Sequence, residues 1–200
     1  MVVVLASGGM DSAVLLAMAQ QKQILSAIVF CWYAQPAALQ EWKALQQQIK
    51  LLKIEAPVHE VPLTTLSAKK MQVDSGLPGP RVVFARNLVM LGHSANYAES
   101  IGANRVWYGA TADDFKEYHD CRPIFLDAIN VCLQDVKVEA PLSEYHKPKI
   151  RALLKQYQIP IGDTWSCYAP IKNNPCEACD SCKLRYSNEM TLHNDETWRL

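Results

Sequence analysis

The chain has 200 residues, and half of them are hydrophobic, which suits one domain or one domain with a small appendage. Twenty Lys and Arg residues balance twenty Asp and Glu residues, and this balance excludes a strongly basic nucleic-acid-binding protein. No apolar run approaches the roughly 18 residues that a membrane span needs, and the start lacks the basic region of a secretory signal. We therefore expect a compact cytoplasmic protein.

Short apolar runs alternate with helix-sized segments along the first 160 residues. The predicted strands are 2–6, 24–31, 54–61, 105–110 and 136–140, and the predicted helices are 13–20, 36–52, 87–101, 123–133 and 147–158. Residues 74–80 hold two glycines and two prolines, so we expect a loop there. This alternation predicts an α/β fold with a doubly wound, Rossmann-like parallel sheet over residues 1–160. We expect residues 161–200 to form a separate segment packed on that domain.

A glycine loop, Ser7-Gly-Gly-Met-Asp-Ser12, follows the first predicted strand and opens the first predicted helix. The N-terminus of a helix carries about half a positive charge, and glycines let backbone N–H groups approach an anion closely. The loop is neither a lysine-bearing P-loop nor a dinucleotide fingerprint, because Gly-Lys-Ser/Thr and GxGxxG are both absent. A turn capped by Ser or Asp is the alternative, and Asp11 would either cap the helix or hold Mg²⁺.

This loop resembles the pyrophosphate loop of the N-type ATP pyrophosphatases. The resemblance implies that ATP is cleaved between its α and β phosphates. It also implies an ATP site made by Ala6, Ser7, Gly8, Gly9, Met10, Asp11 and Ser12.

Four of the seven cysteines, Cys167, Cys176, Cys179 and Cys182, fall within sixteen residues. Four thiolates complete a tetrahedral shell around zinc at about 2.3 Å per bond, and a closed shell indicates a structural ion. An iron–sulfur cluster is the rival occupant, since four thiolates hold it equally well. We expect the segment to fold around its metal and to fix the C-terminal part of the chain on the main domain.

A polar segment over 111–123 follows the predicted strand 105–110, and Arg86 and Asn87 open a predicted helix. In an open parallel sheet, ligands bind beyond the carboxyl ends of the strands, where the polar segment and the glycine loop both belong. The residues of the segment that can bind a polar heterocycle and a carboxylate are Asp113, Asp114, Tyr118, Asp120 and Arg122. The alternative is a solvated loop in which Asp120 caps the helix that follows.

Taken together, these motifs resemble the 7-cyano-7-deazaguanine synthase family. The resemblance covers nearly the whole chain and rests on S-G-G-M-D-S at 7–12, A-R-N at 85–87, D-D-F-K-E-Y-H-D-C-R-P at 113–123, and W-S-C-Y with C-x-x-C-x-x-C at 165–182. The chain departs from the family at Tyr33-Ala-Gln-Pro-Ala37, where the family carries Tyr-Gly-Gln-Arg-His. It also has Ala85 where the family has the glycine of Pro-Gly-Arg-Asn.

The resemblance implies conversion of 7-carboxy-7-deazaguanine, ammonia and ATP into the nitrile, AMP and pyrophosphate. The carboxylate attacks the α-phosphate, ammonia displaces AMP to give the amide, and a second activation dehydrates the amide. Mg²⁺, a structural Zn²⁺ and a homodimer are implied as well. The candidate catalytic residues are Asp11, Arg86, Asp114, Arg122 and Lys147, and the candidate substrate-binding residues are Gln35, Arg86, Asn87, Asp114, Tyr118, Asp120 and Arg122.

Several alternatives stay open at this point. A related adenylating enzyme would stop at the amide or modify a macromolecule, and a zinc-knuckle nucleic-acid binder belongs to another class altogether. Lys147 either reaches a phosphate or is a solvated lysine. Tyr168 packs either on the cysteine site or on the base of the substrate, and we interpret it as a packing residue. The expected partners are a small-molecule substrate and ammonia, with neither a membrane nor a directly bound nucleic acid.

Overall fold

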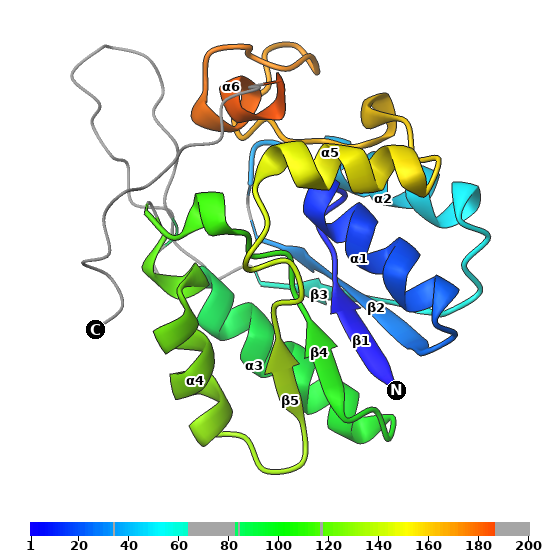
Figure 1. The fold of residues 1–200 in the computed structure, drawn as a ribbon, viewed down its shortest axis with the longest axis vertical. Coiled ribbons are helices and arrows are strands. Elements are labelled where there is room, and N and C mark those ends of the chain that lie inside the picture. The colour runs from blue at the N-terminus through cyan, green and yellow to red at the C-terminus, as the bar shows by residue number, and fades with distance from the viewer. Residues whose placement is uncertain (34, 64–82, 84, 117, 187–200) are drawn as a thin grey trace.

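The computed structural model describes residues 1–33, 35–63, 83, 85–116 and 118–186. Five parallel strands form one sheet in the order β3-β2-β1-β4-β5 (Figure 1). The strands are β1 (Val2–Leu5), β2 (Leu25–Trp32), β3 (Val58–Pro62), β4 (Arg105–Trp107) and β5 (Lys137–Glu139). The predicted doubly wound parallel sheet is therefore confirmed, whereas the loop expected at 74–80 lies outside the described residues.

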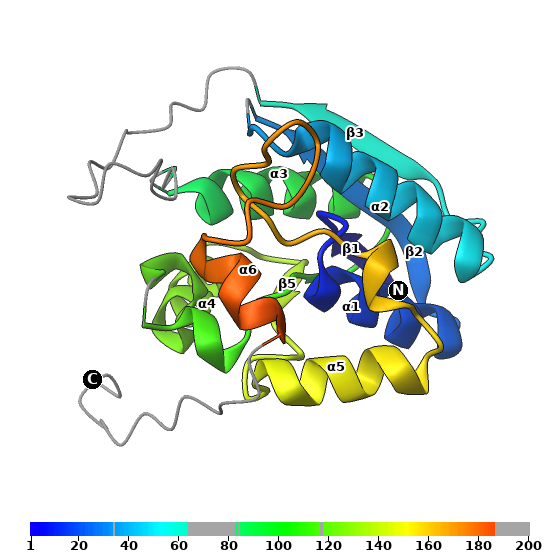
Figure 2. The ribbon, with the colours of Figure 1, turned by 90° about the horizontal axis from the view of Figure 1, so that it is seen from above.

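Helices cover both faces of the sheet (Figure 1). One face is covered by α1 (Met10–Gln21), α2 (Ala38–Leu51) and α5 (Lys147–Gln156), and the other by α3 (Arg86–Ser100) and α4 (Pro123–Val131). The short helix α6 (Asp180–Tyr186) lies above the carboxyl ends of the strands, as the side view and the view from above agree (Figures 1 and 2). The described residues also form three 3-10 helices: η1 (Ala112–Asp114), η2 (His119–Cys121) and η3 (Ile161–Asp163).

Each face of the sheet carries its own hydrophobic core. Val2 and Val4 of β1 join the core under α1 and α5, whereas Val3 joins the core under α3 and α4. All three side chains are fully buried. A strand buried on both faces reads as a continuous apolar run, which is why residues 2–5 show no polar alternation.

The third strand begins later than its sequence indicates. The apolar pattern starts at Ile54, but β3 begins at Val58, directly after Pro57, and ends at Pro62. Proline cannot donate a ladder hydrogen bond and is therefore tolerated at the edge of a sheet, where β3 lies.

The chain changes sides of the sheet between β1 and β4. The connection that leaves β1 runs into α1 on one face, and the connection that enters β4 comes from α3 on the other face. Loops at neighbouring carboxyl ends then diverge and leave a crevice, which is where open α/β sheets bind ligands. The glycine loop after β1 and the polar loop after β4 both belong to this edge.

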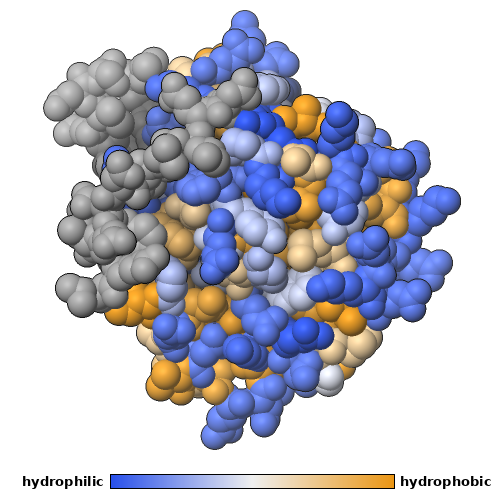
Figure 3. Space-filling view, viewed as in Figure 1, coloured by the Kyte–Doolittle hydropathy of each residue, from blue (hydrophilic) through white to orange (hydrophobic). Residues whose placement is uncertain are grey.

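Polar side chains cover most of the face seen in Figure 3, and hydrophobic ones gather at its lower left, where α4 lies. Ile124 and Val131 of α4 are 61% and 85% exposed. Among the described residues, no helix combines the length and the hydrophobicity that crossing a membrane requires.

Two glycines with the same backbone conformation have different surroundings. Gly8 has a φ of +73°, and an added Cβ would lie 2.2 Å from the carbonyl oxygen of Glu41. Gly102 has a φ of +72°, with open space around it. We predict that Gly102→Ala lowers the free energy of unfolding by about 1 kcal/mol, the cost of a left-handed L-residue. Gly8→Ala adds the clash and should cost about 2–4 kcal/mol. Denaturant titration measures both, and equal losses would contradict the close approach of α2 to the loop.

Candidate active site

A cavity of about 180 Å³ opens at the crevice beyond β1 and β4. Its walls come from the glycine loop, the end of β2, the starts of α2 and α3, and the loop after β4. The predicted site residues that line it are Ala6, Ser7, Gly9, Asp11, Ser12, Arg86, Asn87, Asp114 and Tyr118. Those that do not line it are Gly8, Met10, Gln35, Asp120, Arg122, Lys147 and the four cysteines. The two predicted halves, an anion loop and a polar wall, therefore share one cavity.

The glycine loop presents the N-terminus of α1 to this cavity. Gly9 is the N-cap residue and receives no side-chain cap, so the alternative of a Ser- or Asp-capped turn is wrong. The hydroxyl of Ser12 donates to the carbonyl oxygen of Gly9 over 3.1 Å. An uncapped helix start beside Ser7 and Ser12 is suited to bind an anion, because backbone N–H groups and the helix dipole both favour negative charge.

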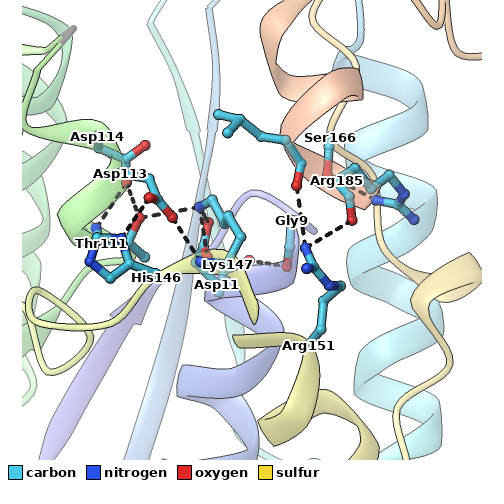
Figure 4. Close-up of polar contacts among 12 residues, drawn as sticks. Gly9, Asp11, Thr111, Asp113, Asp114, His146, Lys147, Arg151, Ser166 and Arg185 are labelled. Atoms are coloured by element: carbon cyan, nitrogen blue, oxygen red, sulfur yellow. Dashed lines mark hydrogen bonds and ion pairs between the residues drawn. The ribbon is translucent and has the colours of Figure 1, made fainter. Parts of the chain in front are cut away.

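Asp11 forms a two-point ion pair with Lys147. The Nζ atom of Lys147 lies 3.0 and 2.9 Å from the two carboxylate oxygens and donates to the hydroxyl of Thr111 over 3.3 Å (Figure 4). Burial lowers the pKa of Lys147, but the carboxylates of Asp11 and Asp114 outweigh it and raise that pKa above its ordinary value. Lys147 is thus a buried cation, and its interpretation as a solvated lysine is wrong.

Two carboxylates of the polar loop fix local structure next to the cavity. Asp114 accepts hydrogen bonds from the N–H and the hydroxyl of Thr111, at 2.8 and 2.7 Å. Asp113 accepts the N–H of Lys147 at 2.7 Å and lies 2.7 Å from Nδ1 of His146 (Figure 4). Asp113 therefore caps the start of α5, where its negative charge also interacts favourably with the helix dipole.

Asp120 caps a helix as well, but not the one that follows it in sequence. Its Oδ2 accepts the N–H of Asn87 at 3.1 Å, in the first turn of α3, and the Asn87 side chain donates back to the Asp120 carbonyl at 3.1 Å. The N-cap of α4 is Arg122, which makes no side-chain cap bond. The interpretation of Asp120 as the cap of α4 is therefore wrong, because a long-range partner takes its carboxylate.

Arg122 and Gln35 do not line the cavity but hydrogen-bond to residues next to it. The Nε of Arg122 donates to the carbonyl oxygen of Phe115 over 2.7 Å and closes the loop between them. The Nε2 of Gln35 donates to the Cys31 carbonyl at 3.2 Å and to the Glu41 carboxylate at 3.1 Å. Contact of either side chain with substrate stays a prediction.

Several lining residues were not predicted from the sequence to belong to the site: Tyr33, Glu41, Tyr108, Cys121 and Tyr168. Arg86 donates to the hydroxyl of Tyr33 over 2.9 Å, and burial raises the pKa of Tyr33 to about 12. Burial also raises the pKa of Glu41. The buried hydroxyl of Tyr108 has no hydrogen-bond partner within the described part of the chain. Tyr168, interpreted as a packing residue, lines the cavity, and its place beside a metal ligand was the available signal.

The backbone conformation at Ala85 explains why the family motif carries a glycine at this position. Ala85 has a φ of +55°, in the left-handed region, immediately before Arg86 and the start of α3. Glycine adopts this conformation without steric cost, which explains a glycine at the matching place in the family motif. Ala85 keeps the geometry at a cost of about 1 kcal/mol.

The four clustered cysteines lie close enough together to hold a metal ion. Their Sγ atoms all lie within 4.8 Å of one another, close to the roughly 3.8 Å edge of a zinc–thiolate tetrahedron. The N–H of Cys176 donates to Sγ of Cys167 at 3.2 Å, and the N–H of Cys179 donates to Sγ of Cys176 at 3.4 Å. Such N–H donors stabilise thiolates, so the donor set fits a metal such as zinc.

The comparisons with known proteins agree with this geometry. A family model described as "Queuosine biosynthesis protein QueC" matches residues 1–190. The chain belongs to this family. It is 31% identical to the 7-cyano-7-deazaguanine synthase of Thermoplasma volcanium, over 94% of this chain and 86% of that protein. The synthase of Nitratiruptor sp. is also 31% identical, over 92% and 90% of the two chains. Membership in this family supports a role in making the queuosine precursor.

Solved structures share the fold at lower identity. The U34-tRNA thiolase NcsA from Methanococcus maripaludis, solved with its [4Fe-4S] cluster, has a TM-score of 0.57 and 13% identity, over 86% of this chain and 61% of that one. An NMN synthetase from Francisella tularensis has a TM-score of 0.55 and 15% identity, over 92% and 74%. These likenesses confirm the α/β fold that the sequence predicts.

Breaking the Asp11–Lys147 pair should destabilise the fold. We predict that Lys147→Met lowers the free energy of unfolding by about 2–4 kcal/mol, because it leaves a partly buried carboxylate without its cation. The double variant Asp11→Asn with Lys147→Met removes both charges and should recover part of that loss. Denaturant titration of four proteins measures the coupling: the wild type, the single variants Lys147→Met and Asp11→Asn, and the double variant. Losses that simply add would contradict an energetically coupled pair.

The metal site predicts a second outcome. We expect about one zinc per chain from elemental analysis of the purified protein, and Cys179→Ser should lower both the metal content and the solubility. Cys132→Ser is the matched control, since Cys132 is exposed and lies outside the cluster. A metal-free wild-type protein of full stability would exclude a structural metal, and iron with sulfide would identify a cluster in place of zinc.

Proposed function

We propose that the chain is an ATP-dependent carbon–nitrogen ligase, which converts 7-carboxy-7-deazaguanine and ammonia into 7-cyano-7-deazaguanine. The observation that carries the proposal is one cavity shared by the uncapped start of α1 and by Arg86, Asn87 and Asp114. The first half suits the phosphates of ATP, and the second half suits a polar heterocyclic acid. Family membership supplies the substrate class.

The glycine loop receives the pyrophosphate part of ATP in this proposal. Backbone N–H groups at the start of α1, with the hydroxyls of Ser7 and Ser12, bind the oxygens on which negative charge accumulates when the α–β bond breaks. Mg²⁺ bound with the nucleotide would neutralise phosphate charge, and the cavity-facing carboxylates of Asp11 and Asp114 are its candidate ligands. Lys147 holds Asp11 in place and keeps its charge compensated.

Arg86 and Asn87 face the acceptor side of the cavity. The planar guanidinium of Arg86 can bind the substrate carboxylate with two parallel hydrogen bonds and orient it toward the α-phosphate. A carboxylate is already ionised at neutral pH, so its attack needs no general base. Tyr118 and Tyr168 line the same cavity and offer aromatic surface to a planar heterocycle.

The reaction balances over two activations. The acid and ATP give the acyl adenylate and pyrophosphate, and ammonia displaces AMP to leave the amide. The amide oxygen then attacks the α-phosphate of a second ATP and releases a second pyrophosphate. Loss of the second AMP and of both amide protons gives the nitrile. An enzyme that stops at the amide would use the same cavity for the first activation only.

The surroundings of the reaction are part of the proposal. The substrate is a small molecule, no nucleic acid binds directly, and the protein acts in the cytoplasm. The family resemblance implies a homodimer, and the exposed Ile124 and Val131 of α4 provide apolar surface for one.

The product tests the proposed function. Protein incubated with ATP, Mg²⁺, ammonium and 7-carboxy-7-deazaguanine should yield the nitrile mass, with AMP and pyrophosphate. Ser7→Ala should reduce pyrophosphate release at least about tenfold, because it removes an anion-binding donor. Ser100→Ala is the control, since that exposed hydroxyl bonds only its own helix. The amide alone would replace the nitrile synthase with an amide-forming ligase. No AMP from folded, metal-loaded protein would reject the ligase altogether.

A further inference from the structure

Arg185 of α6 is a buried cation that meets backbone oxygens rather than an acid. It is 8% exposed, and within the described ranges it makes no ion pair. Its guanidinium donates to the carbonyl oxygen of Ile161 and to that of Thr164 at 2.8 Å. It also donates to the hydroxyl of Ser166 at 2.8 Å (Figure 4). Burial of a guanidinium is costly unless its donors are used, and here three of its bonds converge on residues 161–166. We call this stretch the strap.

The strap also hydrogen-bonds to the glycine loop. The N–H of Trp165 donates to the carbonyl oxygen of Gly8 at 2.9 Å. The fully buried Gln48 of α2 donates to the same oxygen at 2.8 Å and to the carbonyl of Asp163 at 3.0 Å. Gly8 is thereby fixed between α2 and the strap, directly before Gly9, the N-cap residue of α1.

The cysteine cluster fixes the helix that carries Arg185. Cys182 lies one turn before Arg185 on α6, so the two side chains share a face of the helix. Arg151 of α5 adds donors to the carbonyls of Leu184 and Arg185, each at 3.4 Å (Figure 4). An unbroken series of contacts therefore joins the metal site to the nucleotide loop.

We propose that Arg185 is a positioning residue for ATP binding, which transmits the order of the cysteine cluster through the strap to Gly8. This inference rests on the proposed use of ATP by the glycine loop. Nucleotide and metal then stabilise the same arrangement of the strap, so each strengthens the binding of the other by an equal factor.

The kinetic test uses the full, zinc-loaded chain. Arg185→Met should raise the KM for ATP about tenfold, with kcat within about twofold and zinc content unchanged, because the loop is loosened while the cysteines stay. Arg185→Lys should recover only part of the loss, since one ammonium cannot reproduce the guanidinium fork. Lys183→Met is the matched control, an exposed cation on the same helix. An unchanged KM for ATP in Arg185→Met with its zinc bound would overturn the proposal.

A second variant and a second readout guard against a purely structural effect. Ser166→Ala removes one acceptor of Arg185 and should raise the KM for ATP about two- to threefold. If Arg185→Met loses its zinc, this variant decides the test, and an unchanged KM for ATP in Ser166→Ala rejects the proposal. In wild type, α,β-methylene-ATP should slow extraction of zinc by a chelator several-fold, and Arg185→Met should abolish that protection. Equal protection in both proteins would reject the coupling.

The two proposals fail separately. A wild-type protein that makes no AMP rejects the ligase, whereas direct binding of α,β-methylene-ATP to wild type and to Arg185→Met still tests the strap.

Discussion

The carbonyl oxygen of Gly8 accepts two hydrogen bonds, one from the side chain of Gln48 on α2 and one from the backbone N–H of Trp165 in the strap. The loop can enter this position only without a side chain, because the Glu41 carbonyl occupies the place of a Cβ. The path of the glycine loop is thus fixed by α2 and the C-terminal strap together. This contact joins the start of α1, where we propose that phosphate binds, to the segment that leads into the cysteine cluster.

Acidic residues surround a site proposed for anionic ligands, and the structure compensates their charge locally. Asp11 is paired with Lys147, Asp113 caps α5, and Asp120 caps α3. A carboxylate at a helix start or beside an ammonium repels an incoming phosphate far less than an isolated one. The same contacts tie the polar loop to α3 and α5, so the loop proposed to bind substrate is held at both helix starts.

The sequence predicted those features that local patterns encode. The alternation of strands and helices, the glycine loop and the close spacing of four cysteines each appear within a few residues, and the structure confirms the fold and gathers the four thiols. The partners of Asp120, Lys147 and Arg185 could not be predicted, because each contact joins segments far apart in the chain. Glu41 and Tyr108 were missed for the same reason, since only the packing of α2 and β4 at the crevice brings them to the cavity.

The central claim is that this crevice transfers the substrate carboxyl oxygens to the α-phosphate of ATP. The most direct measurement uses 7-carboxy-7-deazaguanine labelled with ¹⁸O at both carboxyl oxygens and determines the mass of the AMP released. Two activations predict two AMP per nitrile, each carrying one ¹⁸O atom. Unlabelled AMP, or label recovered in inorganic phosphate, would contradict adenylation of the substrate.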